Sequence, residues 1–264
     1  MIYTIRDLRL SFPDMARKPL LGRAPRIEIL KGISFDVPKG EVLGIVGGSG
    51  SGKSTLGRAM LRLIEPDSGT IEFEGRDITH AREDTLRPLR HRFQMIFQDP
   101  MSSLNPRRRV GGIIAGPLRL QGLDGIPARV DVALDMVGLP RHFATRYPHE
   151  LSGGQRQRVG IARAIALRPQ FILADEIVSG LDVSSQAQVL NLLEDLVREL
   201  DLTLAFISHD LSVIRRLCDR VLVLHHGEVV EQAETASLFD APKATYTREL
   251  LDAIALPDPD QPWG

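Results

Sequence analysis

The sequence predicts an α/β protein built around a mainly parallel sheet. Three short apolar runs, at residues 42–46, 171–174 and 204–207, have the length of buried strands, and segments with helical periodicity lie beside them. A glycine-rich loop separates the first run from a helix expected from Lys53 to about Leu63. Strands that alternate with helices in this way form parallel sheets with helical layers.

The composition is that of a globular protein. Of the 264 residues, 43% are hydrophobic and 25% are charged, which excludes a disordered, collagen-like or coiled-coil chain. The 33 basic and 34 acidic side chains give a net charge of -1, so the total charge does not favour nucleic acid as a partner. Cys218 is the single cysteine, which leaves no disulfide framework and favours a reducing cytoplasm. The charged N-terminal segment and the lack of a long apolar run predict neither a signal peptide nor a membrane span.

Two regions predict antiparallel strands. Residues 2–12 alternate imperfectly between apolar and polar side chains, as a half-buried strand does, and residues 27–37 are the expected partner. The Pro-, Arg- and Lys-rich segment 13–26 between them indicates a surface loop. A later strand at 221–224 precedes His226-Gly227, a dipeptide that favours a hairpin turn and therefore an antiparallel edge.

The middle of the chain differs in character from both ends. Residues 110–147 combine helical periodicity with repeated Gly and Pro and contain no convincing strand, which predicts an inserted helical subdomain. The final PDPDQPWG indicates a disordered tail or a docking extension. We expect one domain over 1–264, with the core and its β subdomain in 1–98 and 148–235, the helical subdomain in 99–147 and a C-terminal extension in 236–264.

The glycine-rich loop matches the phosphate-binding pattern G-x-x-x-x-G-K-[ST] between a strand and a helix. Its four glycines are expected to adopt positive φ and let backbone amides approach a pyrophosphate. Lys53 supplies a charge for the β and γ phosphates, and the Ser54 hydroxyl is a ligand for Mg²⁺. The motif consists of Gly47, Gly48, Ser49, Gly50, Ser51, Gly52, Lys53, Ser54 and Thr55.

Two carboxylates follow the apolar run at 171–174. Asp175 is the candidate for the Mg²⁺ shell, through water, and Glu176 is the candidate that polarises the attacking water. A pair of solvated carboxylates at a strand end is the alternative. The phosphate loop favours the catalytic interpretation.

The segment Leu151-Ser152-Gly153-Gly154-Gln155, followed by RQRVGIARAI, resembles the signature sequence of the ABC-transporter ATPases. From its residues alone it is a second glycine-rich helix N-terminus with a hydroxyl, able to hold phosphate oxygens, and an ordinary helix cap is the alternative. The resemblance implies an ABC-type P-loop NTPase fold. It also implies that Ser152, Gly153, Gly154 and Gln155 close on an ATP molecule held by a second ATPase subunit.

Other residues align with landmarks of that family. Gln98 in FQDP resembles the Q-loop residue that contacts Mg²⁺ and the attacking water, and His209 in FISHD resembles the switch histidine. Asp182 in SGLD resembles the loop at the dimer interface, although it also suits the N-terminus of a helix expected near Ser185. Phe12 is the candidate for stacking on adenine, with a buried core aromatic as the alternative.

The sequence departs from the family pattern directly after Glu176. Ile177-Val178 stand where Pro-Thr is usual and Gly180 where Ala is usual, so we expect a slightly different local geometry without loss of a charge.

Residues 97–118, beginning FQDPMSSLNP, and the later PKATYTRELLDAI resemble the dipeptide, oligopeptide and nickel importer branch. This resemblance implies an ATP- and Mg²⁺-dependent motor for import of peptides or a related small solute, such as nickel or an opine-like compound. The implied partners are an identical or paralogous ATPase, two transmembrane permeases and, indirectly, a solute-binding protein. The implied location of this chain is peripheral, at the cytoplasmic face of the bacterial inner membrane. A soluble non-transport ABC ATPase and an ATP-binding regulatory cassette are the alternatives.

Overall fold

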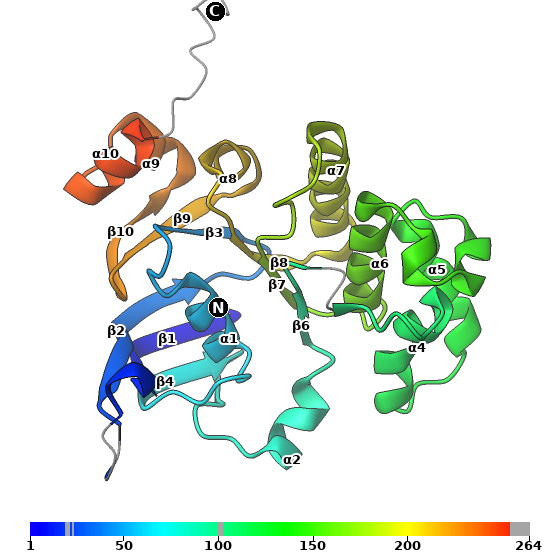
Figure 1. Cartoon of the computed structure of the whole chain (residues 1–264), viewed down its shortest axis with the longest axis horizontal. Coiled ribbons are helices and arrows are strands. Elements are labelled where there is room, and N and C mark those ends of the chain that lie inside the picture. The colour runs from blue at the N-terminus through cyan, green and yellow to red at the C-terminus, as the bar shows by residue number, and fades with distance from the viewer. Residues whose placement is uncertain (19–21, 23, 100–102, 254–264) are drawn as a thin grey trace, which may run out of the picture. The chain divides into compact units, whose positions relative to one another are not determined.

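The computed structural model describes residues 1–18, 22, 24–99 and 103–253 (Figure 1). The described residues form two compact units. The first comprises residues 1–80 and those from 206 onward, and the second comprises residues 81–205. The division falls within strand β8, Thr203–Ile207. None of the described helices is both long and apolar enough to cross a lipid bilayer.

The first unit contains an antiparallel sheet with the order β2-β1-β4-β5. The predicted pairing of the first two strands is confirmed, with Tyr3 opposite Val37 and Phe12 opposite Ile27. Strand β4 was not predicted; it pairs with the other edge of β1. The strands are β1 (Tyr3–Pro13), β2 (Arg26–Val37), β4 (Ser68–Phe73) and β5 (Arg76–Asp77).

A bulge explains the imperfect alternation of β1. Tyr3 and Ile5 are buried at odd positions, whereas Leu8 and Leu10 are buried at even positions. Asp7 lies between them with φ 43°, and the register of both neighbouring strands shifts there. One extra residue in a strand moves the following side chains to the opposite face, so the apolar set stays on the buried side.

The first unit also holds the strand that leads into the phosphate loop. Strand β3 is parallel to β9, and β9 is antiparallel to β10 through the predicted His226-Gly227 turn. Both turn residues have positive φ, as the tight hairpin requires. The elements are β3 (Val42–Val46), α1 (Lys53–Met60), α8 (Leu211–Leu217), β9 (Arg220–His225), β10 (Glu228–Glu234), α9 (Thr235–Asp240) and α10 (Thr245–Asp252).

The second unit contains parallel strands and most of the helices. Strand β6 is parallel to β7, and every residue of β7 and β8 is buried, as strands covered on both faces are. The prediction of helices without strands in 110–147 is confirmed, whereas β6 was not predicted. The elements are α2 (Glu83–Leu86), β6 (Phe93–Ile96), α4 (Val110–Leu120), α5 (Ile126–Met136), α6 (Gly153–Ile165), β7 (Phe171–Asp175) and α7 (Val183–Leu200). The C-terminal PDPDQPWG lies outside the described residues, as do parts of the 13–26 loop.

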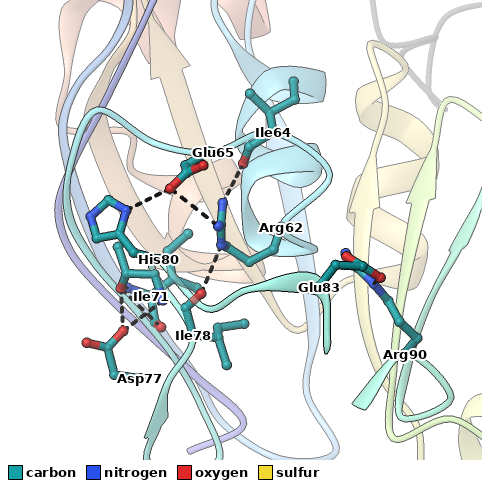
Figure 2. A network of polar contacts seen from close by, with 10 residues as sticks. Arg62, Ile64, Glu65, Ile71, Asp77, Ile78, His80, Glu83 and Arg90 are labelled. Carbon is teal, nitrogen blue, oxygen red and sulfur yellow. Dashed lines mark hydrogen bonds and ion pairs between the residues drawn. The ribbon is translucent and has the colours of Figure 1, made fainter. Parts of the chain in front are cut away.

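Helix α1 ends earlier than the predicted Leu63 because Arg62 adopts a left-handed conformation with φ 52°. The amides of Arg62 and Leu63 return to the carbonyls of Ala59 and Arg58, which closes the helix end. Figure 2 shows the Arg62 side chain, which donates to the carbonyls of Ile78 and Ile64 at 2.9 and 3.3 Å. This buried side chain therefore ties the end of the helix that follows the phosphate loop to the segment after β5.

We expect Arg62→Met to lower the free energy of unfolding by about 2–3 kcal/mol, because it leaves buried carbonyls without their charged donor. Urea unfolding measures the change. Arg198→Met is the matched control, since its ion pair with Asp195 is exposed and its loss should change stability by no more than about 0.5 kcal/mol. Equal effects of both changes would show that Arg62 does not hold the helix end.

Candidate functional site

The phosphate loop begins directly after β3. Gly47, Gly50 and Gly52 have positive φ, at 146°, 74° and 103°. The expectation of positive φ at all four glycines is wrong for Gly48. At this position the lack of a side chain leaves room for the Tyr246 hydroxyl. A Cβ at Gly48 would lie only 3.0 Å from the Tyr246 hydroxyl.

The loop curls around the Lys53 side chain, which is buried. Lys53 Nζ donates to the carbonyl oxygens of Gly47 and Gly48 at 2.8 and 2.9 Å. The ammonium is therefore held inside the loop by two of the loop's own residues. Phosphate oxygens are the ligands expected for an ammonium held in a loop of this kind.

The N-terminus of α1 suits a phosphate group. The helix begins after Gly52, which has no side chain to cap it, and its first turn holds no acidic residue, so the positive end of the helix dipole faces the loop. The Ser51 Oγ is buried and has no hydrogen-bond partner within the described part of the chain. An uncapped helix start, a buried ammonium and a buried hydroxyl are the groups that a nucleotide phosphate satisfies.

The hairpin between β9 and β10 supports the loop from another side. Gly227 N donates to Ser51 O at 3.1 Å, and Gly227 O accepts from Lys31 N at 2.9 Å. A Cβ at Gly47 would collide with the carbonyl of Leu224 in β9. The loop conformation therefore depends on close backbone contacts with β9 and the following turn.

In the second unit, the structure brings Gln98 and Glu176 together. Gln98 Nε2 donates to Glu176 Oε2 at 2.7 Å. The contact follows from the topology, because β6 and β7 are parallel neighbours and both side chains lie just beyond their carboxyl ends. Asp175, the last residue of β7, is buried at the same strand end.

Glu176 has φ 49°, a backbone conformation that is costly for a residue with a side chain. The turn that follows holds it there, since the Ser179 hydroxyl donates to the Glu176 carbonyl at 2.8 Å. The unusual Ile177 and Val178 are buried, and Gly180 has φ 76°, which an Ala would strain. The departures from the family pattern thus fit the local backbone.

The remaining candidates of the first unit are His209 and Phe12. His209 is exposed and lies between the end of β8 and the start of α8, which Asp210 caps. Phe12 is 40% exposed near the end of β1, so its alternative interpretation as a buried core aromatic is wrong. Adenine stacking by Phe12 stays a prediction.

The signature segment forms the start of α6. Ser152 Oγ accepts from Gln155 N at 3.3 Å, and Gln155 Oε1 accepts from Ser152 N at 3.0 Å, which is a capping box. Ser152 therefore caps this helix, and closure of the segment on an ATP molecule stays a prediction. A pocket of about 330 Å³ lies beside this helix start and is lined by Ser152, Gly154, Arg158 and Ser185, among others.

Asp182 caps α7, which begins at Val183, two residues before Ser185, so its predicted place at a helix N-terminus is confirmed. Its carboxylate accepts from the Ser185 amide at 2.9 Å and the Ser185 hydroxyl at 2.8 Å. These hydrogen bonds lower the pKa of Asp182, so the carboxylate is charged at neutral pH.

Sequence reasoning missed Tyr246, whose hydroxyl accepts from Gly48 N at 2.7 Å. The two residues are 198 positions apart, and no local pattern connects them. Strand β6 was also missed, although Gln98 itself was identified through the resemblance.

Known proteins resemble this chain in sequence. Residues 30–179 match the family model described as ABC transporter. A Brucella ovis protein with the provisional name peptide import ATP-binding protein is 52% identical over 90% of this chain and 76% of its own length. The glutathione import ATP-binding protein GsiA of Salmonella paratyphi A is 48% identical over 98% of this chain and 42% of its own length.

Solved structures show the same fold. A dimeric ATP-binding cassette, MJ0796, bound to ADP and Pi in a post-hydrolysis state, has a TM-score of 0.77 and 29% identity over 88% of this chain and 98% of its own. The cbiO1 protein of Clostridium perfringens, part of an ABC transporter complex, has a TM-score of 0.77 and 30% identity over 91% of both chains.

We expect Lys53→Ala to weaken ATP binding by about 10- to 100-fold, the loss that corresponds to a charged hydrogen bond of roughly 1.5–3 kcal/mol. Titration with a fluorescent ATP analogue measures the affinity. Lys39→Ala is the control, because the Lys39 side chain is exposed and pairs with Glu74. Unchanged affinity in the Lys53 variant would overturn the phosphate-loop assignment.

Proposed function

Because the chain belongs to the ABC transporter family, whose model matches more than half of it, we propose that it is the ATP-hydrolysing subunit of a membrane importer for peptides or a related small solute. The names of its relatives, a peptide importer ATPase and a glutathione importer ATPase, support this substrate class, since glutathione is itself a small peptide. Nickel and opine-like solutes remain within the class that the resemblance implies.

One observation carries the hydrolytic function: the hydrogen bond between Gln98 and Glu176 at the ends of adjacent parallel strands. A carboxylate that orients an attacking water must itself be held in place, and the amide of Gln98 provides that contact. In the proposed step the water oxygen bonds to the γ phosphorus while the bond between that phosphorus and the β,γ-bridging oxygen breaks and ADP leaves. Glu176 accepts the proton that the water loses, and His209 assists by contacting the γ phosphate.

ATP and Mg²⁺ are the proposed ligands of the phosphate loop. The Ser54 hydroxyl, Gln98 and, through water, Asp175 would hold the ion. The ion would supply positive charge that offsets part of the negative charge of the phosphates. Lys53 and the loop amides orient the same phosphates, while Phe12 offers a face to the adenine.

Two subunits form the working unit in this proposal. The start of α6, with Ser152, Gly153, Gly154 and Gln155, would close on the ATP held by the phosphate loop of an identical or paralogous subunit, and Asp182 would lie at their interface. The dimeric state of the solved cassette MJ0796 supports this arrangement. The ATPase pair would bind two permeases from the cytoplasmic face of the inner membrane, and a solute-binding protein would be an indirect partner.

A soluble ABC ATPase without a transport role is the second class of function, and a regulatory cassette that binds ATP without hydrolysing it is the third. Co-purification separates an importer subunit from a soluble ABC ATPase, because the importer subunit should be retained by its permeases. The presence of Asp175, Glu176 and His209 favours hydrolysis over the regulatory alternative.

We expect Glu176→Gln to reduce ATP hydrolysis by at least about 10²-fold, because the amide cannot act as a base. ATP affinity should stay close to the original value, since the amide oxygen of Gln still accepts from Gln98. Phosphate release gives the rate, and size-exclusion chromatography with ATP and Mg²⁺ should show an accumulated dimer. Glu199→Gln, an exposed change on α7, is the control. Hydrolysis at the original rate would assign the base to another residue.

The segment from Gln98 to residue 118 is the proposed contact with the permease. Arg163 of α6 lies over the exposed Phe97 ring at 5.7 Å and donates to Ser103 O at 2.6 Å. Its partial burial lowers the pKa of the guanidinium. The segment beyond Gln98 is thus tied to the signature helix, and a partner that moves it would act on both.

The basic run Arg107, Arg108 and Arg109 is exposed in this segment, with a solvated surface as the alternative role. Single cysteines at 105, 107 and 108 in the assembled transporter should crosslink to a permease. Cys218 should give no background, because it is buried and burial raises the pKa of its thiol. A cysteine at 199 on α7 is the control. Adducts with only the second ATPase would exclude this contact.

A further inference from the structure

The C-terminal helix α10 reaches the phosphate loop through one side chain. Gly48 N donates to Tyr246 Oη at 2.7 Å. The carbonyl of the same peptide group, Gly47 O, accepts from Lys53 Nζ at 2.8 Å. A single peptide group is therefore held at its amide by Tyr246 and at its carbonyl by Lys53. Rotation of this peptide group would break both hydrogen bonds.

The Tyr246 ring is held in place by a second contact. It stacks on His225, with ring centroids 3.7 Å apart and planes 12° apart. His225 is the last residue of β9, directly before the turn in which Gly227 N donates to Ser51 O. Tyr246 and its stacking partner therefore contact the loop from neighbouring positions, one at Gly48 and the other through the turn at Ser51.

The start of α10 is fixed by a buried carboxylate. Glu231 of β10 accepts from Lys243 N at 2.8 Å and Ala244 N at 2.9 Å, immediately before the helix begins at Thr245. Burial opposes ionisation of Glu231, but the surrounding hydrogen-bond donors outweigh it and the pKa lies below its ordinary value. A charged Glu231 thus sets the place of the first turn, which carries Tyr246.

We propose that Tyr246 is a positioning residue of the nucleotide site, through which α10, anchored by Glu231, fixes the Gly47-Gly48 peptide group and with it the Lys53 ammonium. The inference rests on the proposed function in one respect, that the loop binds ATP. Tyr246 touches neither phosphate nor the attacking water in this role. Its loss should therefore weaken nucleotide binding more than it slows hydrolysis of bound ATP.

Tyr246→Phe tests the proposal, because it keeps the ring stack on His225 and removes only the hydroxyl. We expect the Kd for a fluorescent ATP analogue and the KM for ATP to rise about three- to tenfold, the equivalent of one hydrogen bond, with kcat changed by less than about twofold. Thermal unfolding should be close to that of the unmodified chain. Tyr147→Phe is the control, because Tyr147 also stacks on a histidine, His149, in the other compact unit.

Glu231→Gln provides an independent variant that leaves Tyr246 intact. Glu231 uses one carboxylate oxygen for each backbone amide, whereas Gln has a single amide oxygen, so one of the two amides loses its acceptor. The variant should therefore raise the Kd in the same direction as Tyr246→Phe. The double variant should have about the same Kd as the weaker-binding single variant. The two effects should not add, because both changes release the same peptide group.

The outcomes separate the two proposals. An unmodified chain that binds no ATP analogue would overturn the proposed function. An unmodified chain that binds, together with a Tyr246→Phe variant of equal Kd and KM, would overturn the positioning role. A variant with lowered thermal stability and an unchanged Kd would show that Tyr246 contributes only to the packing of α10. That outcome would also overturn the positioning role.

Discussion

The geometry of the phosphate loop depends on two places where backbones touch with no room for a side chain. At Gly47 a Cβ would collide with the carbonyl of Leu224, and at Gly227 it would collide with the carbonyl of Ile29. These contacts bring β3, the β9-β10 turn and β2 together around one loop. The glycine at each point is required by close approach as well as by positive φ, so an Ala at either position would displace the elements that shape the loop.

The Lys53 ammonium and the Gln98–Glu176 pair are positioned by different kinds of contact. In the first unit, one buried ammonium, Lys53, is held by carbonyls of its own loop, which is a local device. In the second unit, Gln98 and Glu176 meet because two strands that are far apart in the sequence are parallel neighbours. The left-handed backbone at Glu176 shows that the strand end is not relaxed, and the Ser179 hydroxyl stabilises the turn that keeps the carboxylate in place.

Local sequence patterns predicted a strand that is buried at every residue and a turn with a characteristic dipeptide. Strand β3 was placed at its observed bounds because all of its residues are buried, and the His226-Gly227 turn was found because its dipeptide favours positive φ. The bulge at Asp7 could not be predicted, since in the sequence an extra residue only makes the alternation of apolar and polar side chains imperfect. The contact of Tyr246 with Gly48 was also invisible, because it joins segments whose proximity is decided by the packing of α10 on β10.

Ser152 and Asp182 show why the same sequence pattern can predict both a helix cap and a binding residue. Both side chains accept hydrogen bonds from the first turn of a helix, Ser152 in α6 and Asp182 in α7. A helix start attracts an oxygen acceptor whether that acceptor is a cap or a phosphate, because both satisfy the same amides and the same dipole. A neutral hydroxyl such as Ser152 can exchange one partner for another at little electrostatic cost. The carboxylate of Asp182 is charged, so it also interacts favourably with the positive end of the α7 dipole.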